Sequence, residues 1–371
     1  MHSRFYYSQQ LARFDFGPDH PFKPERAQKA HELCNRYGVL NHPHITLKSP
    51  PVLDKKKLLF AHSQEYLDAL KRISEGELFQ DMLQFGLGTE DNPPLKGIYE
   101  WSVKCAGATW EGMMSLLDGS ADIVFNPLGG FHHARRSQAE GFCYINDLVI
   151  AIEEALCHNA RITYLDIDAH HGNGVQEAFY REDRVQVISL HESGKFLYPY
   201  SGNLEESGEG KGRGFTINIP FPPKTDDELY LKVFHRVVIP LIKRFEPDFL
   251  VAEIGADTMI SDPLTDFMLT NNSYTEVIRN LKALSEKILA TGGGGYDIYR
   301  TARCWTLAWA ILNDIEPVDE FAGLVGGMMF GPEMEVSSLH DRPYTLTGPQ
   351  KDTLRREVDS TIAYLIKRHN L

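Results

Sequence analysis

The sequence predicts an α/β fold in which a mostly parallel sheet is covered by helices on both faces. Short runs rich in β-branched and aromatic residues alternate along the chain with longer amphipathic runs, and this alternation is typical of parallel sheets. Polar and glycine-rich motifs follow several of the short runs directly. Because the carboxyl ends of parallel strands meet at one edge of a sheet, we expect these motifs to converge there on a ligand.

The predicted strands are short, apolar and bounded by polar or turn residues. They are expected at residues 122–125, 162–165, 185–190, 249–252 and 287–290. The helices are predicted from their 3.6-residue apolar periodicity. They are expected at residues 147–158, 175–180, 227–242 and 274–289. The last helix and the last strand overlap at 287–289, so the sequence leaves that boundary open.

The composition is that of a folded globular protein. Of the 371 residues, 42% are hydrophobic and 24% are charged, and no repeat or low-complexity tract divides them, so we expect a single domain over residues 1–371. The motifs lie within about 18–315, and about 316–371 is expected to be a helical segment. The formal net charge of −13 argues against a nucleic-acid partner, which needs a basic surface, and adds a weak attraction for cationic substrates.

The compartment is expected to be the cytoplasm. The five cysteines are odd in number and show no CxxC spacing, which fits a reducing compartment better than a disulfide framework. The N-terminus lacks an export signal, and no apolar run approaches the roughly 18 residues of a membrane span. No membrane partner is therefore expected, and the sequence leaves the oligomeric state open.

A catalytic metal site is predicted from two of the strand ends. Asp168 and His170 lie two residues apart after one strand, so in extended backbone their side chains point the same way. Asp257, after another strand, would complete three ligands and leave one position for water, as in catalytic zinc sites. A lone aspartate at a strand end is usually a turn or cap residue, but the DxDxHH run makes that reading the weaker one. Asp166 is expected to support the ligands or to bind a monovalent ion.

Two further strand ends carry groups suited to acid–base and oxyanion chemistry. His132 and His133 follow two glycines, where backbone can approach a ligand, and imidazole titrates near neutrality. We expect them to act as general base and general acid rather than as core residues. The run 292–295 is four glycines before Tyr296. It could be a simple turn, but it would also let the Tyr296 hydroxyl donate to an oxyanion.

These motifs resemble those of histone deacetylases. The resemblance rests on the runs NPLGGFHHA (126–134), GFCYIND (141–147), DIDAHHGNG (166–174), GADT (255–258) and GGGGY (292–296), in this order. It covers most of the chain from His20 to Trp305. The run GLGTEDNP (86–93) is most similar to bacterial acetoin-utilisation-type members.

The resemblance implies the arginase/deacetylase fold, a single-domain, three-layer fold with a mostly parallel sheet of about eight strands and helices on both faces. It also implies hydrolysis of the amide bond of an acyl-lysine, or of a similar small acylated amine, by metal-activated water. It implies Zn²⁺, or Fe²⁺ in the cell, bound by Asp168, His170 and Asp257. It further implies that His132 and His133 are the acid–base pair and that Tyr296 polarises the carbonyl. These assignments agree with those made from the residues themselves.

The resemblance also implies residues that spacing alone does not predict. Substrate-binding roles fall to Phe142 and Tyr198 as tunnel walls, Gly141 beside them, Asp91 at the rim and Arg26 near an inner acetate cavity. A structural K⁺ or Na⁺ would be held by Asp166, Asp168, His170, Ser189 and Leu190. Read alone, each aromatic is more often core, Asp91 a turn residue and Arg26 a solvated helix residue.

Two residues depart from the commonest pattern of the family. Asn173 stands where many members have an Asp that orients the second histidine, and Glu253 replaces a frequent Gln near the metal. Two other functions stay open: a dinuclear-manganese ureohydrolase, which lacks the HH pair and GGGGY, and a non-enzymatic acyl-lysine binder, which usually lacks a ligand or the Tyr. The sequence does not identify the physiological substrate or acyl chain.

Overall fold

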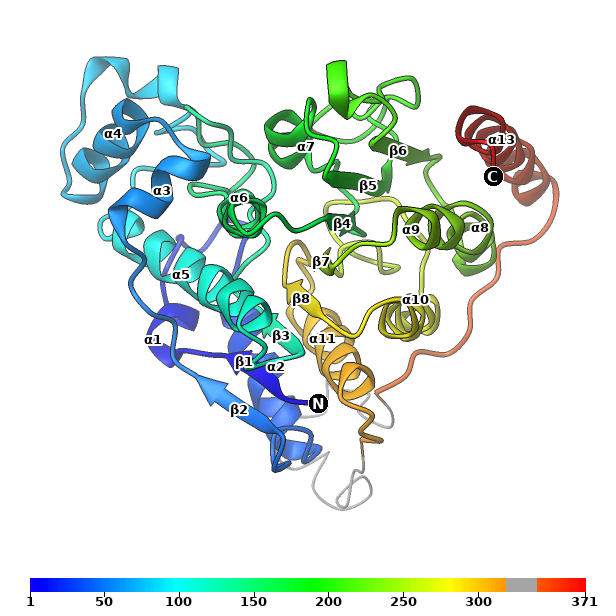
Figure 1. Ribbon diagram of the computed structural model, residues 1–371, viewed down its shortest axis with the longest axis horizontal. Helices are drawn as coiled ribbons and strands as arrows, with labels where there is room; N and C mark the ends of the chain where they lie inside the picture. The colour runs from blue at the N-terminus through cyan, green and yellow to red at the C-terminus, as the bar shows by residue number, and fades with distance from the viewer. Residues whose placement is uncertain (318–338) are drawn as a thin grey trace.

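The computed structural model describes residues 1–317 and 339–371. Within these residues one eight-stranded sheet has the order β2-β1-β3-β8-β7-β4-β5-β6 (Figure 1). Every adjacent pair of strands is parallel, so the predicted fold class is confirmed. The strands are β1 (Ser3–Tyr6), β2 (Ile45–Lys48), β3 (Ile123–Asn126), β4 (Ile162–Asp166), β5 (Val185–Glu192), β6 (Thr216–Phe221), β7 (Phe249–Glu253) and β8 (Ile288–Thr291).

Successive side chains of the central strands enter two different hydrophobic cores, because side chains alternate across a strand. Ile123 and Phe125 of β3 pack in one core, and Val124 between them packs in the other. The first core is closed by α2 (Glu25–Arg36), α8 (Asp227–Val233), α9 (Ile239–Phe245), α10 (Asn271–Leu284), α11 (Ile298–Leu312) and α13 (Pro349–His369). The second core is closed by α3 (Lys55–Ala61), α4 (Gln64–Ser74), α5 (Ile98–Leu117), α6 (Asp147–Cys157) and α7 (Asn173–Phe179). The sheet is therefore the middle of three layers.

The boundary that the sequence left open falls between Leu284 and Ile288. Helix α10 ends at Leu284, and β8 begins at Ile288. Ile288 and Leu289 are fully buried in opposite cores, and a short strand inside a parallel sheet buries both faces. Residues 287–289 thus belong to the strand side of the boundary rather than to the predicted helix.

The helix predicted at 227–242 is divided into three pieces. Between α8 and α9 lies a π-helical turn, Phe234–Val238. Pro240 follows near the start of α9, and proline has no N–H for the regular ladder, so a local change of winding accommodates it. The chain stays helical from α8 through the π-helical turn into α9.

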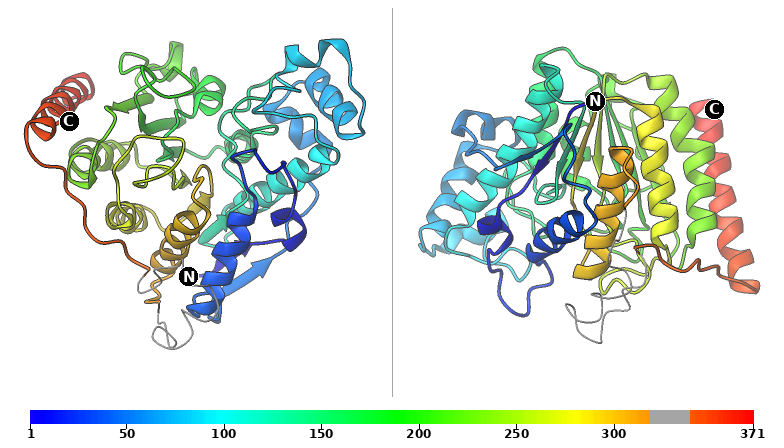
Figure 2. Two further views of the ribbon diagram at one scale, coloured as in Figure 1. Left: turned by 180° about the vertical axis from the view of Figure 1, so that it is seen from behind. Right: turned by 90° about the horizontal axis from the view of Figure 1, so that it is seen from below.

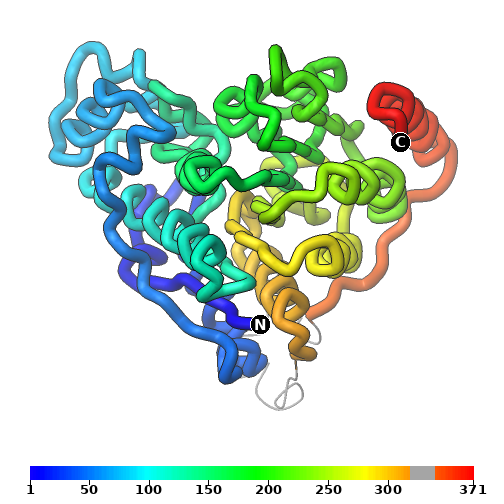
Figure 3. Tube along the Cα trace, viewed as in Figure 1, coloured from blue at the N-terminus to red at the C-terminus, as the bar shows by residue number. Residues whose placement is uncertain are grey.

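The C-terminal segment expected to be helical contains one helix among the described residues, α13. Residues 339–348 run without regular structure along the outside of the molecule to reach it (Figure 3). Lys351 of α13 donates to Asp226 at 2.6 Å and to Glu228 at 2.7 Å, and α11, α10, α8 and α13 lie side by side on this flank (Figure 2, right). Residues 318–338 of the expected segment lie outside the described residues. None of the described helices is long and apolar enough to cross a membrane.

Candidate active site

Four neighbouring strands deliver the predicted motifs to one edge of the sheet. The strands β3, β8, β7 and β4 are adjacent in that order. The segments that follow them carry His132–His133, Tyr296, Asp257 and Asp168–His170, respectively. The parallel topology alone therefore brings together residues that are up to 164 positions apart in the chain (from 132 to 296).

The three expected metal ligands form one compact buried group. The Nδ1 atom of His170 lies 3.0 Å from Oδ1 of Asp168 and 2.9 Å from Oδ2 of Asp257, and ligand atoms of all three lie within 4.8 Å of one another. Burial alone would lower the pKa of His170, but its hydrogen bonds and the charges of both carboxylates raise it to about 10. Burial and the charge of Asp168 raise the pKa of Asp257 to about 8. Two buried carboxylates this close need a positive charge between them, so the donor set fits a divalent cation.

The paired histidines lie beside this group with their Nε2 atoms 3.1 Å apart. His132 Nδ1 is 2.8 Å from Oδ2 of Asp166, and His133 Nδ1 is 2.8 Å from Oδ1 of Asn173. Burial opposes a charge on His132, but the carboxylates of Asp166 and Asp168 outweigh it and raise its pKa. Burial and the positive charge of His132 lower the pKa of His133 well below its usual value. The pair is therefore arranged to share one proton, with His132 the more basic member.

The loop that carries the two histidines is held by Asn146 and Asp147 at the start of α6. The Asp147 carboxylate accepts the backbone N–H groups of Gly130 at 3.1 Å and Phe131 at 2.9 Å. The Asn146 side chain donates to the carbonyl of Ala134 at 2.9 Å. Both residues lie in the run 141–147, but the sequence alone indicates no role for them. An Asn-Asp pair at a helix start is the signal that could have indicated such anchoring.

Tyr296 faces the metal-ligand group from the loop after β8. Its ring lies edge-on to His170 at 6.2 Å and to Phe142 at 5.9 Å between centroids. Its backbone N–H donates to Oδ2 of Asp262 at 2.8 Å, a contact that the sequence does not predict. Burial and the charge of Asp257 hold the pKa of the Tyr296 phenol well above its usual value. The hydroxyl therefore stays protonated and can donate a hydrogen bond.

Position 294 in the Tyr296 loop requires glycine because two of the ligand carboxylates lie too close to its backbone for a Cβ atom. A Cβ on Gly294 would lie 2.5 Å from Oδ2 of Asp168 and closer still to Oδ2 of Asp257. The Gly294 N–H donates to Oδ2 of Asp168 at 2.6 Å. The loop backbone is thus part of the wall around the two carboxylates.

The expected tunnel residues lie around the same group. Phe142 and Tyr198 are half-buried, and the Tyr198 ring lies 5.3 Å from that of His133. Gly141 has a φ of +52°, and a Cβ there would meet the His133 ring and, at 3.0 Å, the Tyr198 ring. Asp91 is exposed, and its carbonyl oxygen is 3.2 Å from Nε2 of His20, whose ring packs on Phe142 at 4.9 Å.

Arg26 lies beneath the glycine loop and is 2% exposed. It donates to the carbonyl of Gly295 at 2.8 Å and to that of Gly293, and its guanidinium packs on the rings of Phe22 and Trp305. It is therefore not the solvated helix residue that its sequence position alone would suggest.

The residues expected to hold a monovalent ion are buried on β4 and β5. Asp166 and Ser189 are opposite each other in the sheet register. Oδ2 of Asp166 also accepts from the Tyr164 hydroxyl at 2.7 Å, and the Ser189 hydroxyl is 2.9 Å from Nδ1 of His191. Leu190 can offer only its backbone carbonyl.

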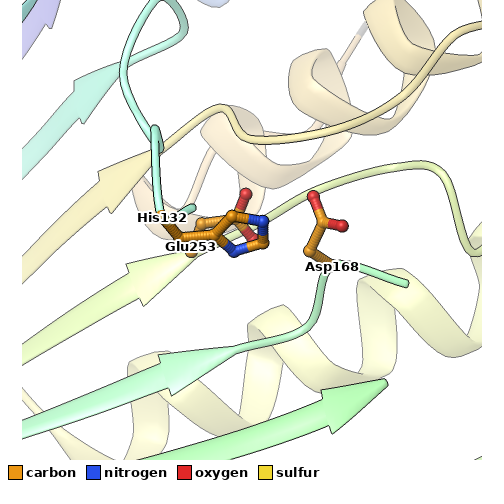
Figure 4. A group of neighbouring side chains, drawn as sticks. All are labelled: His132, Asp168 and Glu253. Carbon is orange, nitrogen blue, oxygen red and sulfur yellow. The ribbon is translucent and has the colours of Figure 1, made fainter. Parts of the chain in front are cut away.

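Glu253 adds a fourth buried carboxylate to this neighbourhood, beside those of Asp166, Asp168 and Asp257 (Figure 4). It is fully buried, its Oε1 has no hydrogen-bond partner within the described residues, and it forms a second group of possible ligands with His132 and Asp168. Burial and the charges of Asp168 and Asp166 raise its pKa well above the usual value. Both ring nitrogens of His132 are already engaged by Asp166 and His133. This second group is consequently less suited to a cation than the first.

Comparison with known sequences gives a match over most of the chain. A family model described as "Histone deacetylase domain" matches residues 20–312. Histone deacetylase B of Dictyostelium discoideum is 36% identical over 318 residues, which are 85% of this chain and 75% of that protein. Histone deacetylase 1 of Homo sapiens is 34% identical over 346 residues, which are 92% of this chain and 70% of that protein.

Solved structures agree. The crystal structure of an HDAC homolog from Aquifex aeolicus superposes with a TM-score of 0.84 at 29% identity, covering 98% of this chain and all of that one. An HDAC homolog complexed with SAHA gives 0.82 at 28% identity with the same coverage. Fold, site and family together define a metal-dependent hydrolase. The chain belongs to the histone deacetylase family, whose fold and deacetylase class it shares.

Proposed function

We propose that this protein is a zinc-dependent amidohydrolase that removes acyl groups, chiefly acetyl, from lysine side chains of proteins or from similar acylated amines. The observation that carries the proposal is the joint presence of a three-ligand group, a histidine pair and a tyrosine hydroxyl at one edge of the sheet. Each of these three parts is needed for amide hydrolysis at a metal.

The proposed metal ligands are Asp168, His170 and Asp257. When bound, a zinc ion would supply a Lewis acid that polarises the scissile carbonyl and lowers the pKa of a water at its open position. His133 and His132 would take the proton of that water and return it to the leaving amine at their Nε2 atoms. Asp166 and Asn173 would orient the two rings through Nδ1.

Tyr296 would donate a hydrogen bond from its hydroxyl to the oxyanion that forms from the carbonyl oxygen. Its raised pKa suits this role, because a donor must stay protonated at working pH. Phe142 and Tyr198 would enclose the acyl-lysine stem, and Gly141 would line the tunnel beside them. Asp91 would accept hydrogen bonds from the substrate backbone at the rim, and Arg26 would lie next to the released carboxylate.

The dinuclear alternative has one observation behind it, the His132–Asp168–Glu253 group. A second ion there would need a nitrogen of His132 that is already hydrogen-bonded. We therefore propose one catalytic divalent cation per chain, with a K⁺ or Na⁺ beside Asp166 as a separate structural ion. We further propose that residues 1–371 act as one deacetylase domain in the cytoplasm.

A substrate panel with metal analysis tests the proposal. Purified protein is assayed for release of the free acid from acetyl- and longer acyl-lysine peptides and acetylspermidine, and for release of urea from a guanidino compound such as arginine. We expect hydrolysis of acyl-lysine with one divalent ion per chain. Hydrolysis of the guanidino compound with two ions per chain would instead support the ureohydrolase.

Acetylpolyamines are expected to be poor substrates. The resemblance implies that polyamine-selective members carry an acidic residue in the stretch Asp-Pro-x, where it can pair with ammonium groups, whereas this chain has the apolar Leu264 after Asp262-Pro263. Oδ1 of Asp262 accepts the Leu264 N–H at 3.0 Å, and Oδ2 accepts that of Tyr296, so both of its oxygens are engaged. More efficient hydrolysis of acetylspermidine than of acetyl-lysine peptide would show this expectation to be wrong.

A further inference from the structure

The Asn173 side chain lies between a histidine of the pair and a carboxylate. Its Oδ1 is 2.8 Å from Nδ1 of His133, and its Nδ2 donates to Oε1 of Glu140 at 2.8 Å. Asn173 is 6% exposed and begins α7, so its backbone position is fixed. The side-chain amide can still be turned in two ways, and the turn decides whether His133 faces an acceptor or a donor.

Glu140 decides between the two orientations. A carboxylate paired with a guanidinium offers only hydrogen-bond acceptors, and Oε2 of Glu140 accepts from Nε of Arg135 at 2.6 Å. Arg135 is itself anchored to Glu177 at 3.0 Å. The amide nitrogen of Asn173 must therefore face Glu140, and its oxygen must face His133. As a result, Nδ1 of His133 carries a proton, and the neutral ring presents the lone pair of Nε2 toward His132.

The position of Glu140 is set by the turn that carries the tunnel wall. Glu140 and Cys143 exchange backbone hydrogen bonds of 3.1 and 2.9 Å, and Gly141 and Phe142 between them have φ values of +52° and +68°. Positive φ at both central residues is the signature of a type I′ turn. After burial, the negative charge of Glu140 is the next cause that raises the pKa of the Tyr198 phenol. Glu140 thus lies where Phe142, Tyr198 and the histidine pair meet.

We propose that Glu140 is a positioning residue that fixes the tautomer of His133 through Asn173. In the Arg135–Glu140–Asn173–His133 chain the hydrogen bonds converge on the carboxylate: Arg135 and the Asn173 amide both donate to Glu140, and the His133 imidazole donates to the amide oxygen of Asn173. The tautomer of His133 is set by these hydrogen bonds, whatever reaction the site catalyses. Its consequence for catalysis rests on the proposed function.

The variant Glu140→Gln tests the proposal because it keeps the shape of the side chain and changes only its polarity. Arg135 demands an acceptor, so the glutamine oxygen would face Arg135 and its NH₂ group would face Asn173. The Asn173 amide would then turn and present its own NH₂ group to His133, which would move the His133 proton from Nδ1 to Nε2. Glu177→Gln is the matched control, since it neutralises the other carboxylate partner of Arg135 and leaves the Glu140 side chain unchanged.

The tautomer is read from long-range ¹H–¹⁵N correlations of ¹⁵N-histidine-labelled, zinc-loaded protein, with the His133 signal identified by its loss in His133→Gln. We expect protonated Nδ1 in wild type and in Glu177→Gln, and protonated Nε2 in Glu140→Gln. A Glu140→Gln protein with the wild-type tautomer would overturn the proposal. Glu140→Ala provides a second reading, since loss of the fixed polarity should give a mixture of both tautomers.

Kinetics separate this proposal from the proposed function. In Glu140→Gln we expect kcat for an acetyl-lysine peptide to fall about 10-fold or more with little change in KM, because orientation of a reacting group is lost while substrate contacts remain. If wild type itself hydrolyses no acylated amine, the proposed function fails, and the tautomer result still stands. If wild type is active and Glu140→Gln changes neither tautomer nor kcat, the role of Glu140 fails alone.

Discussion

Replacing Gly294 with Ala should specifically weaken metal binding. The added Cβ would lie 2.5 Å from Oδ2 of Asp168, whereas ordinary contact begins near 3.4 Å, so this oxygen must move by about 0.9 Å (3.4 − 2.5), and Oδ2 of Asp257 by more. Metal–ligand distances tolerate about 0.2 Å. At least one carboxylate should therefore leave the coordination sphere, and we expect the Kd for zinc to rise about 100-fold or more, which is about 2.7 kcal/mol.

The assay is a competition titration of metal-free protein with zinc against a chromophoric chelator, with folding checked by circular dichroism. Gly292→Ala is the control in the same loop. Its Cβ would instead crowd the Pro127 carbonyl and, at 3.0 Å, the Trp305 ring, so it should lower stability while folded protein binds zinc as wild type does. A Gly294→Ala protein that is folded and binds zinc with wild-type affinity would refute the assignment of this loop to the ligand wall.

Three further outcomes are expected. Tyr296→Phe should lower kcat by roughly two to three orders of magnitude while zinc stays bound, since one oxyanion donor is lost but no ligand; near-normal turnover would exclude the role. Asn173→Asp places a negative charge beside Nδ1 of His133 and should move the histidine limb of the pH–rate profile upward, so an unchanged profile in an active, zinc-loaded variant would show that Asn173 does not tune the pair. Buried His62 accepts the Asn146 N–H at 2.9 Å, and burial lowers its pKa from 6.5 to about 4. The unfolded chain binds this proton at a higher pH than the folded chain does. The free energy of unfolding should therefore keep its full contribution from His62 above pH 6.5 and lose about 3 kcal/mol as the pH falls to 4, since a pKa difference of 6.5 − 4 counts about 1.36 kcal/mol per pH unit. In urea melts, His62→Gln should not show this part of the loss of unfolding free energy at acid pH. A pH dependence identical to that of wild type would contradict the role given to His62.

The central strands and their motifs could be predicted because their information is local. β4 is a fully buried apolar run, and the ligands Asp168 and His170 follow it within four residues. The strands β1, β2 and β6 are not among the predicted ones. β1 is only four residues long and half of it is polar, Ser3 and Arg4. β2 is largely exposed and lacks an apolar run, and β6 contains Pro220, a residue that sheets tolerate mainly at their edges.

The groups that orient the site could not be predicted because their contacts are set by tertiary structure. Glu140 reaches Asn173 across 33 positions, and Asp262 reaches Tyr296 across 34. Neither carboxylate lies in a spacing that suggests a partner. The predicted tunnel and rim residues rest on resemblance alone, whereas the acid–base pair His132–His133 also follows from its place at a strand end. The roles of all these residues stay predictions until variants are assayed.

Zinc titration of metal-free protein, with acetate release from an acetyl-lysine peptide as the readout, tests the proposed activity most directly. We predict no turnover without metal, a linear rise with added zinc, and a break at one equivalent per chain. Asp257→Asn should abolish the break by removing one ligand charge. Absence of turnover at every zinc concentration, or a break at two equivalents, would contradict a mononuclear deacetylase at Asp168, His170 and Asp257.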